Sequence, residues 1–170
     1  MIVIEIEIKS KKWLKYQNIC EFIEKTANEI FNLSPLNQLK KTEFSLSISL
    51  SSNLQIKRVN KIYRQKDHAT DVLSFGNIDE DYIRKFGLKK YFNNIKLFML
   101  GDIILGLEYI EKHCKNHQIN FKNHLTHLIL HALLHLIGYD HEINQEQAKI
   151  MENLEITILK KLKIKNPYQQ

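Results

Sequence analysis

Three histidines with the spacing of metal ligands lie late in the chain, at His131, His135 and His141. His131 and His135 are four residues apart, so on an α-helix both imidazoles project from one face about one turn apart. Gly138 can adopt a positive φ and end that helix, which lets the chain turn back and bring His141 to the pair. Three neutral imidazoles leave a fourth coordination position open, as in catalytic zinc sites. The spacing therefore predicts a site for one zinc ion.

The alternative is that His131 and His135 are ordinary polar residues of an apolar helix. Their neighbours are apolar almost all round, which predicts that the helix is buried; they are Leu128, Ile129, Leu130, Leu133, Leu134, Leu136 and Ile137. Burying imidazoles costs free energy unless they gain partners, and a metal ion satisfies them. This favours the metal site.

The residue after the first histidine argues against a peptidase. In the H-E-x-x-H motif of zinc peptidases, a glutamate at that position acts as general base. Here the position holds Ala132, which cannot accept a proton. A peptidase then needs a carboxylate from elsewhere in the chain, such as Glu108, Glu111 or Glu142.

A second polar segment runs from Asn60 to Phe75 and contains Arg64 near the end of a predicted helix. A guanidinium group can bind phosphate through two hydrogen bonds and offset charge in a phosphoryl transition state. The alternative is that Arg64 only offsets the negative end of its helix dipole. The residues alone leave both interpretations open.

Strand and helix patterns interleave along the chain. Alternating apolar residues or short apolar runs predict four strands, over 2–9, 44–51, 71–75 and 97–105. Helical spacing predicts helices over 13–31, 54–63, 106–117, 121–137 and 144–162. The charged stretch 76–96 is predicted to be a long loop or insertion, with room for a hairpin or a short helix. We therefore expect an α+β fold in a single domain over 1–170, with a small mixed four-stranded sheet flanked by about five helices.

Composition limits the classes of function. The net charge of +6 and a pI near 9.2 are compatible with a polyanionic partner such as RNA, but do not establish one. Cys20 and Cys114 fit no metal or redox pattern and are expected to be reduced thiols. The N-terminus is too charged and too regular for a signal peptide, and no apolar run approaches the roughly 20 residues that span a bilayer. We expect a cytoplasmic protein without membrane association.

Three segments, in this order, resemble the YbeY family of bacterial metal-dependent endoribonucleases, which act in ribosomal RNA maturation. Residues 60–75 are similar to the family's N-x-x-Y-R-x-K-D-x-P-T-D-V-L-S-F, residues 100–103 read L-G-D-I, and residues 131–141 are similar to H-G-x-L-H-L-x-G-Y-D-H. The resemblance covers about residues 44–155. Ala132 replaces the family's glycine, Ala69 and Gly76 replace two prolines, and the stretch 76–96 looks longer than usual.

The resemblance implies roles for individual residues. It implies zinc ligation by His131, His135 and His141, in a zincin-like ligand helix, and a part in RNA cleavage for Arg64. Thr70, Asp71 and Ser74 match residues that line the same cleft. The implied activity is metal-dependent hydrolysis of single-stranded RNA, in maturation of the 16S rRNA 3′ end and in ribosome quality control. The implied partners are RNA and the ribosome or its small subunit, with no DNA expected.

Two other functions stay open at this point: a metal hydrolase acting on peptides or amides, and a non-catalytic ribosome-assembly factor with a structural metal. We expect Asp102 to orient a ligand histidine through its free ring nitrogen. His113, His117, His124 and His127 crowd the same region and are expected to lie mostly on the surface or around the ligands, with His127 a rival ligand.

Overall fold

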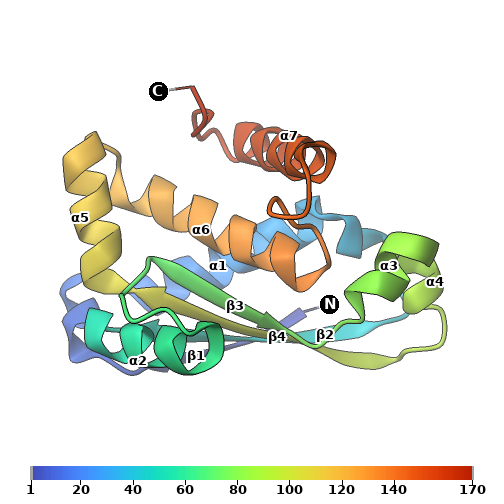
Figure 1. Ribbon diagram of the computed structural model, residues 1–170, viewed down its shortest axis with the longest axis horizontal. Helices are drawn as coiled ribbons and strands as arrows, with labels where there is room; N and C mark the ends of the chain where they lie inside the picture. Colours follow the sequence, from blue (N-terminus) through green and yellow to red (C-terminus); the bar gives the residue numbers. More distant parts are fainter. Residues whose placement is uncertain (1, 170) are drawn as a thin grey trace.

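A four-stranded mixed sheet forms the centre of the computed structural model, which describes residues 2–169 (Figure 1). The strands are β1 (Ile2–Ile8), β2 (Glu43–Ser51), β3 (Val72–Gly76) and β4 (Leu97–Gly106). In the order β1-β2-β4-β3, β1 and β4 run parallel to β2, whereas the edge strand β3 is antiparallel to β4. The four strands and the α+β fold predicted from the sequence are confirmed.

The alternation of residues in β2 gives the sheet its buried face. Phe44, Leu46, Ile48 and Leu50 are each at most 1% exposed, while the serines between them lie on the other face. In β4, Gly101 has φ +140 and sits where the register with β2 shifts. A Cβ there would lie 2.0 Å from the carbonyl oxygen of Phe75, so only glycine lets β3 approach β4 this closely.

Helices α1 (Ile19–Leu33) and α6 (Phe121–Leu136) pack against each other, α1 contacting β1 and α6 contacting β3 and β4. Figure 1 shows α7 (Gln145–Lys161) stacked over α6, farther from the sheet, and α2 (Asn53–Arg64) on the opposite side. Most of α6 is buried between these layers, as its apolar sequence predicts. Of the histidines on α6, His124 is therefore buried, and His127, His131 and His135 are partly buried.

The predicted helix over 13–31 is wrong at its start. A 3-10 helix, η1 (Lys11–Lys15), comes first, and α1 begins only at Ile19. Asn18 has φ +56, a left-handed conformation that interrupts helical hydrogen bonding. Between the two helices the Tyr16 ring stacks on Phe121, with centroids 4.1 Å apart and planes at 2°. Tertiary packing therefore redirects the chain within an apparently continuous helical pattern.

The charged stretch 76–96 forms two short helices, so the described chain has seven α-helices rather than about five. These are α3 (Glu80–Phe86) and α4 (Leu88–Tyr91), separated by Gly87 at φ +81. The Asp79 side chain accepts a hydrogen bond from the Tyr82 backbone N–H and caps α3. No helix among residues 2–169 is long and apolar enough to cross a membrane.

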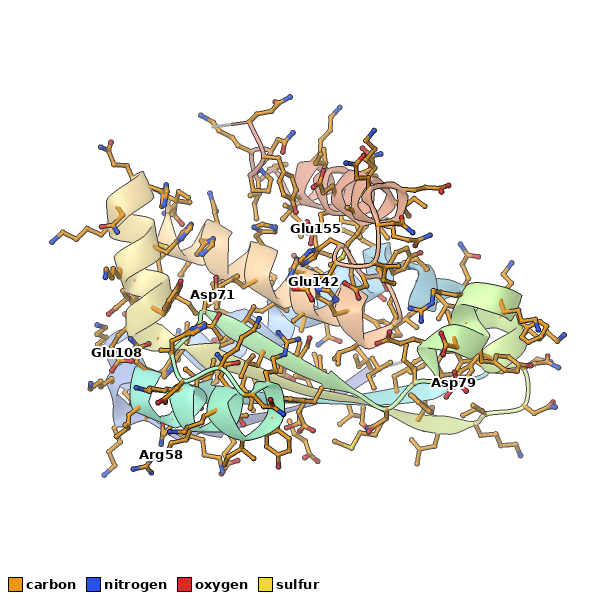
Figure 2. All side chains as sticks on the ribbon, viewed as in Figure 1. Arg58, Asp71, Asp79, Glu108, Glu142 and Glu155 are labelled. Carbon is orange, nitrogen blue, oxygen red and sulfur yellow. The ribbon has the colours of Figure 1, made fainter. Side chains whose placement is uncertain are left out.

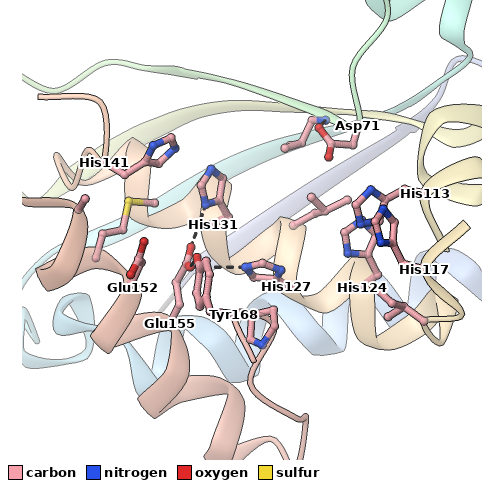
Figure 3. Close-up of a pocket in the computed structure, with 16 residues that line it drawn as sticks. Asp71, His113, His117, His124, His127, His131, His141, Glu152, Glu155 and Tyr168 are labelled. Carbon is pink, nitrogen blue, oxygen red and sulfur yellow. Dashed lines mark hydrogen bonds and ion pairs between the residues drawn. The ribbon is translucent and has the colours of Figure 1, made fainter. Parts of the chain in front are cut away.

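The helices that carry most of the histidines are joined by short turns. α5 (Leu107–His117) ends at Gln118, whose φ of +53 reverses the chain into α6. The side chains of Asn120 and Asn144 cap α6 and α7. After α7 the chain folds back so that Tyr168 reaches Glu155 (Figure 3). The C-terminal tail is thus part of the histidine-lined cavity.

Candidate metal centre

The three predicted ligands come together at the end of α6. The ring centroid of His141 lies 5.1 Å from those of both His131 and His135, which are 4.7 Å from each other. One potential ligand atom from each of the three lies within 4.8 Å of the others. Gly138 has φ +92 and turns the chain after the helix, as its position predicts. The convergence expected from the sequence is therefore present in the fold.

A buried carboxylate that the sequence analysis did not single out orients the first of these histidines. Glu155 on α7 is 0% exposed, and its Oε1 lies 2.8 Å from Nδ1 of His131 (Figure 3). Oε2 lies 3.4 Å from Nε2 of His127 and accepts a hydrogen bond from the Tyr168 hydroxyl. Because Nδ1 of His131 donates to the carboxylate, its Nε2 keeps a free lone pair pointing toward His135.

The electrostatics of the site favour an ionised Glu155 carboxylate and a neutral His135 imidazole. Burial alone raises the pKa of Glu155, but hydrogen bonds from His127, His131 and Tyr168 outweigh it and lower that pKa to about 2. Burial, followed by the nearby His131 and His141 rings, lowers the pKa of His135 to about 4. At neutral pH the imidazole of His135 is thus uncharged and able to donate a lone pair.

These residues fit a zinc ion. Nε2 of His131 and Nε2 of His135 are 3.2 Å apart. Two imidazoles on one tetrahedral zinc place their nitrogens about 3.3 Å apart, given Zn–N bonds of about 2.0–2.1 Å. Without a cation, that separation requires a proton between the two nitrogens or sets two lone pairs against each other. His141 is exposed and supplies the third nitrogen from the solvent side.

Arg64 lies on the same cleft as the three histidines, a hollow of about 170 Å³ also lined by Ser74. The arginine stands at the C-terminal end of α2, with an exposed side chain. The predicted neighbours Thr70 and Asp71 do not line this cleft; Thr70 donates to Asp71, which lines a second, larger cavity instead. The structure therefore brings together Arg64 and the three histidines from distant parts of the sequence.

The structure places each of the four carboxylates that the sequence analysis named near the site. The Asp102 expectation is wrong, because among the described residues it makes no hydrogen bond to a histidine and Glu155 contacts His131 instead. Glu108 and Glu111 pair with Lys12 and Lys15, so neither serves the histidines. Glu142 does line the cleft with Arg64; it lies in the connection between α6 and α7 (Figure 2).

The sequence of α7 has the pattern of an ordinary amphipathic helix with a Glu- and Lys-rich face, and this pattern does not distinguish Glu155 from the exposed glutamates. The signal in the sequence is that Glu155 follows the apolar Met151 by four residues and so lies on the same face of the helix. A glutamate on the apolar face of a helix needs a buried partner.

The fold and the cleft define a small α+β protein with a histidine-rich site able to accept a metal ion, and with an arginine across that site. Comparison with protein-family models narrows the class: the model described as Endoribonuclease YbeY matches residues 5–163. The chain belongs to the YbeY family of endoribonucleases.

Individual relatives agree with this assignment. The chain is 38% identical over 138 residues to an Endoribonuclease YbeY from Ruthia magnifica subsp. Calyptogena magnifica, covering 78% of this chain and 83% of the relative. It is 33% identical over 170 residues to the Endoribonuclease YbeY of Bartonella quintana (strain Toulouse), covering 100% and 99% of the two chains. A solution structure of a Thermotoga maritima protein shares the fold, with a TM-score of 0.57 at 20% identity over 99% of this chain and 96% of that one.

Proposed function

We propose that this protein is a zinc-dependent endoribonuclease that hydrolyses phosphodiester bonds in single-stranded RNA. The observation that carries the proposal is the cleft that holds both Arg64 and the converging nitrogens of His131, His135 and His141. Membership in the YbeY family supports RNA as the substrate. The wider role that we propose is cytoplasmic maturation of the 16S rRNA 3′ end and ribosome quality control, with the small ribosomal subunit as partner.

In this proposal His131, His135 and His141 hold one zinc ion. That ion would supply Lewis-acid chemistry, by polarising a phosphoryl oxygen or by lowering the pKa of a water molecule. Glu155 keeps His131 in the tautomer whose Nε2 faces the ion, and removes part of the cost of gathering imidazoles around a cation. Burial keeps His135 neutral and ready to ligate.

Arg64 has the substrate-directed role. Its side chain lines the cleft from the end of α2, whereas His131 and His135 line it from α6, so a phosphate bound in the cleft can contact both. The guanidinium binds two phosphate oxygens and offsets the negative charge that develops as the new P–O bond forms. The net charge of +6 attracts the polyanion without selecting its sequence.

The alternative is a hydrolase for peptides or amides, in which Glu142 is the candidate general base. Its carboxylate lines the cleft, although Ala132 occupies the position from which a peptidase base acts. Arg64 favours RNA because a guanidinium suits a dianionic transition state. A non-catalytic assembly factor with a structural ion is the other alternative; the exposed His141 and the open cleft argue against a closed structural site.

Purified full-length protein tests the proposal by zinc content and by cleavage of a labelled single-stranded RNA and of a generic peptide substrate. We expect an ion at the histidine centre and RNA cleavage, both lost in His135→Ala, with no peptide hydrolysis. Full zinc content in His135→Ala overturns the ligand assignment. Peptide cleavage without RNA cleavage favours the alternative hydrolase, and tight ribosome binding by metal-replete protein without turnover favours the assembly factor.

A further inference from the structure

Every histidine except His68 belongs to one continuous row of imidazole rings. All of the row except His135 lines a cavity of about 510 Å³ (Figure 3). The centroid separations between neighbours, starting at the end remote from Arg64, are 4.4 Å for His117–His113, 4.4 Å for His113–His124, 6.3 Å for His124–His127 and 6.2 Å for His127–His131. The row then joins the candidate metal centre. Its remote end, His113, His117 and His124, has no part in the function proposed above.

The fold places these three rings together through the turn between α5 and α6. His113 and His117 are four residues apart on α5, the same one-turn spacing as His131 and His135. The left-handed Gln118 then reverses the chain, so that His124 in the first turn of α6 packs against them. The rings of His113 and His124 stack with their planes at 10°. Two helices thus present three imidazoles to one wall of the cavity.

The most specific indication of a ligand at this end of the row comes from His124. It is 8% exposed, and its Nε2 is fully buried without a hydrogen-bond partner among the described residues. Leaving a buried polar nitrogen unpaired costs the free energy of its lost hydration, so native structures rarely do so without a reason. The same side chain lines the cavity, so a rotation of the ring can bring this nitrogen to a species bound there.

We propose that His113, His117 and His124 form a second binding site for a divalent transition-metal ion, Zn²⁺ in particular, separate from the candidate metal centre. Imidazole is a preferred ligand of zinc, copper and nickel. Three imidazoles with a carboxylate or water complete a tetrahedral shell. The proposal rests on the remote end of the row alone and stands or falls independently of RNA hydrolysis.

Asp71 supplies the charge that such a site needs. It lines the same cavity as His113, and Figure 3 shows it facing the row from the opposite wall. Its Oδ1 accepts hydrogen bonds from Thr70 and the Val72 backbone, whereas no hydrogen bond among residues 2–169 uses Oδ2. Burial lowers the pKa of His113 and brings that of His124 to about 4, and Asp71 opposes this only in part. Both rings are therefore neutral at pH 7 and can donate lone pairs.

His127 lies between the two sites and belongs to neither. Its Nε2 faces Oε2 of the buried Glu155, 3.4 Å away. His127, His131 and Glu155 also have ligand atoms within 4.8 Å of one another, but Nδ1 of His131 already donates to that carboxylate. An ion there would compete with the orientation of His131, so the row divides into two separate sites on either side of His127.

Binding at the remote site requires the rings to turn. Among the described residues, only the two groups that include His131 already have their ligand atoms within 4.8 Å of one another. The stacked rings of His113 and His124 can point their nitrogen edges at a shared ion by rotating about the Cβ–Cγ bond, without moving either helix. His117 is exposed and free to follow.

The test is the zinc stoichiometry of metal-free full-length protein after titration with Zn²⁺ and gel filtration. We expect two equivalents in the wild type, one in His113→Gln/His117→Gln and one in His131→Ala/His135→Ala. His68→Gln, an exposed histidine outside the row, serves as the matched control and keeps both ions. Circular dichroism checks that each variant is folded. If His113→Gln/His117→Gln unfolds, the single variant His117→Gln replaces it. In that variant we expect the second zinc ion to bind at least tenfold more weakly.

Several outcomes overturn the proposal. One equivalent in the wild type does so, as does a second equivalent that the His113→Gln/His117→Gln variant retains. Loss of both ions in His131→Ala/His135→Ala, with the protein folded, shows that the remote end binds nothing by itself. RNA cleavage distinguishes this proposal from the proposed endoribonuclease function. We expect cleavage to survive in His113→Gln/His117→Gln and to be lost in His131→Ala/His135→Ala.

Discussion

Glu155 and His131 form the central contact between α7 and α6, with Oε1 of the glutamate 2.8 Å from Nδ1 of the histidine. The carboxylate is fully buried, yet hydrogen bonds from three side chains keep its pKa near 2, against the effect of burial, which raises it. The contact fixes which ring nitrogen faces the cleft. A helix distant in sequence thereby controls the ligand atom of the candidate metal centre.

Replacing Glu155 by glutamine tests this control. The neutral amide cannot carry the negative charge that stabilises the imidazole on a cation, so we expect zinc affinity to fall about 10- to 100-fold. Competition with a chromophoric chelator measures the dissociation constant. Glu152→Gln is the matched control, because Glu152 lines the same cavity but makes no hydrogen bond to a histidine among the described residues. Unchanged affinity in Glu155→Gln means that the negative charge of Glu155 does not stabilise the bound ion.

The C-terminal tail enters the same contact through Tyr168, whose hydroxyl donates to Oε2 of Glu155. Burial, and then the adjacent Glu155, raise the pKa of this phenol, so it stays protonated and keeps donating. We expect Tyr168→Phe to lower the free energy of unfolding by about 1 kcal/mol and zinc affinity by a few-fold. Urea unfolding and chelator competition measure the two effects. Tyr82→Phe controls for loss of a hydroxyl elsewhere, and equal effects in both variants contradict a specific role for the tail.

The sequence predicted the parts of the site that depend on local geometry. The i, i+4 spacing of His131 and His135 and the positive φ of Gly138 follow from helix geometry and from glycine's lack of a Cβ. The four strands follow from two-residue alternation and apolar runs. Each of these signals lies within about ten residues of chain, where pattern and structure are directly linked.

The rest depends on contacts between distant segments. Glu155 is recognisable as a partner of His131 only once α7 packs over α6. The break at Asn18 depends on where Tyr16 meets Phe121. The sequence predicts Asp102 as the partner of a ligand histidine, and sequence order alone does not tell that Glu155 faces α6 instead. The unpaired Nε2 of His124 is a property of packing with no counterpart in the sequence.

Arg64 should matter for turnover and not for zinc content. Lysine keeps the charge but loses the planar two-pronged geometry, so we expect Arg64→Lys to slow RNA cleavage about 10- to 100-fold with the bound zinc unchanged. Single-turnover cleavage of labelled RNA measures the rate. Arg58 is exposed on the same helix and does not line the cleft, which makes Arg58→Lys the matched control. If both variants cleave equally fast, Arg64 acts only on its helix dipole.

The positive φ of Gly138 should be needed to place the third ligand, His141, at the metal centre. An alanine at φ +92 is strained, and its Cβ would lie 3.3 Å from Cδ1 of Ile78, so we expect Gly138→Ala to cost about 1–2 kcal/mol of stability. Displacement of His141 should also weaken zinc binding. Gly87→Ala is the control, with φ +81 and nothing within 4 Å of the added Cβ. It should lose stability for the same backbone reason while binding zinc normally; weakened binding in both variants refutes a specific link to His141.

The buried His124 should make stability depend on pH. Burial, followed by the neighbouring His113 and His127 rings, lowers its folded pKa to about 4 from the ordinary 6.5. Between these two values the unfolded chain binds a proton that the folded protein does not, so stability falls as pH drops from 6.5 toward 4. We expect His124→Gln to reduce the loss between pH 7 and pH 5 by roughly 1–2 kcal/mol.

Urea unfolding of chelator-treated protein at several pH values measures this dependence without a contribution from bound metal. The exposed His117 provides the control, because His117→Gln removes a histidine of the same row without removing a buried one. Its unfolding curve should keep the wild-type pH dependence. Equal slopes for His124→Gln and wild type would mean that His124 takes up a proton in the folded state. Its ring would then be charged inside the cavity, which is incompatible with a neutral ligand held ready for a metal ion.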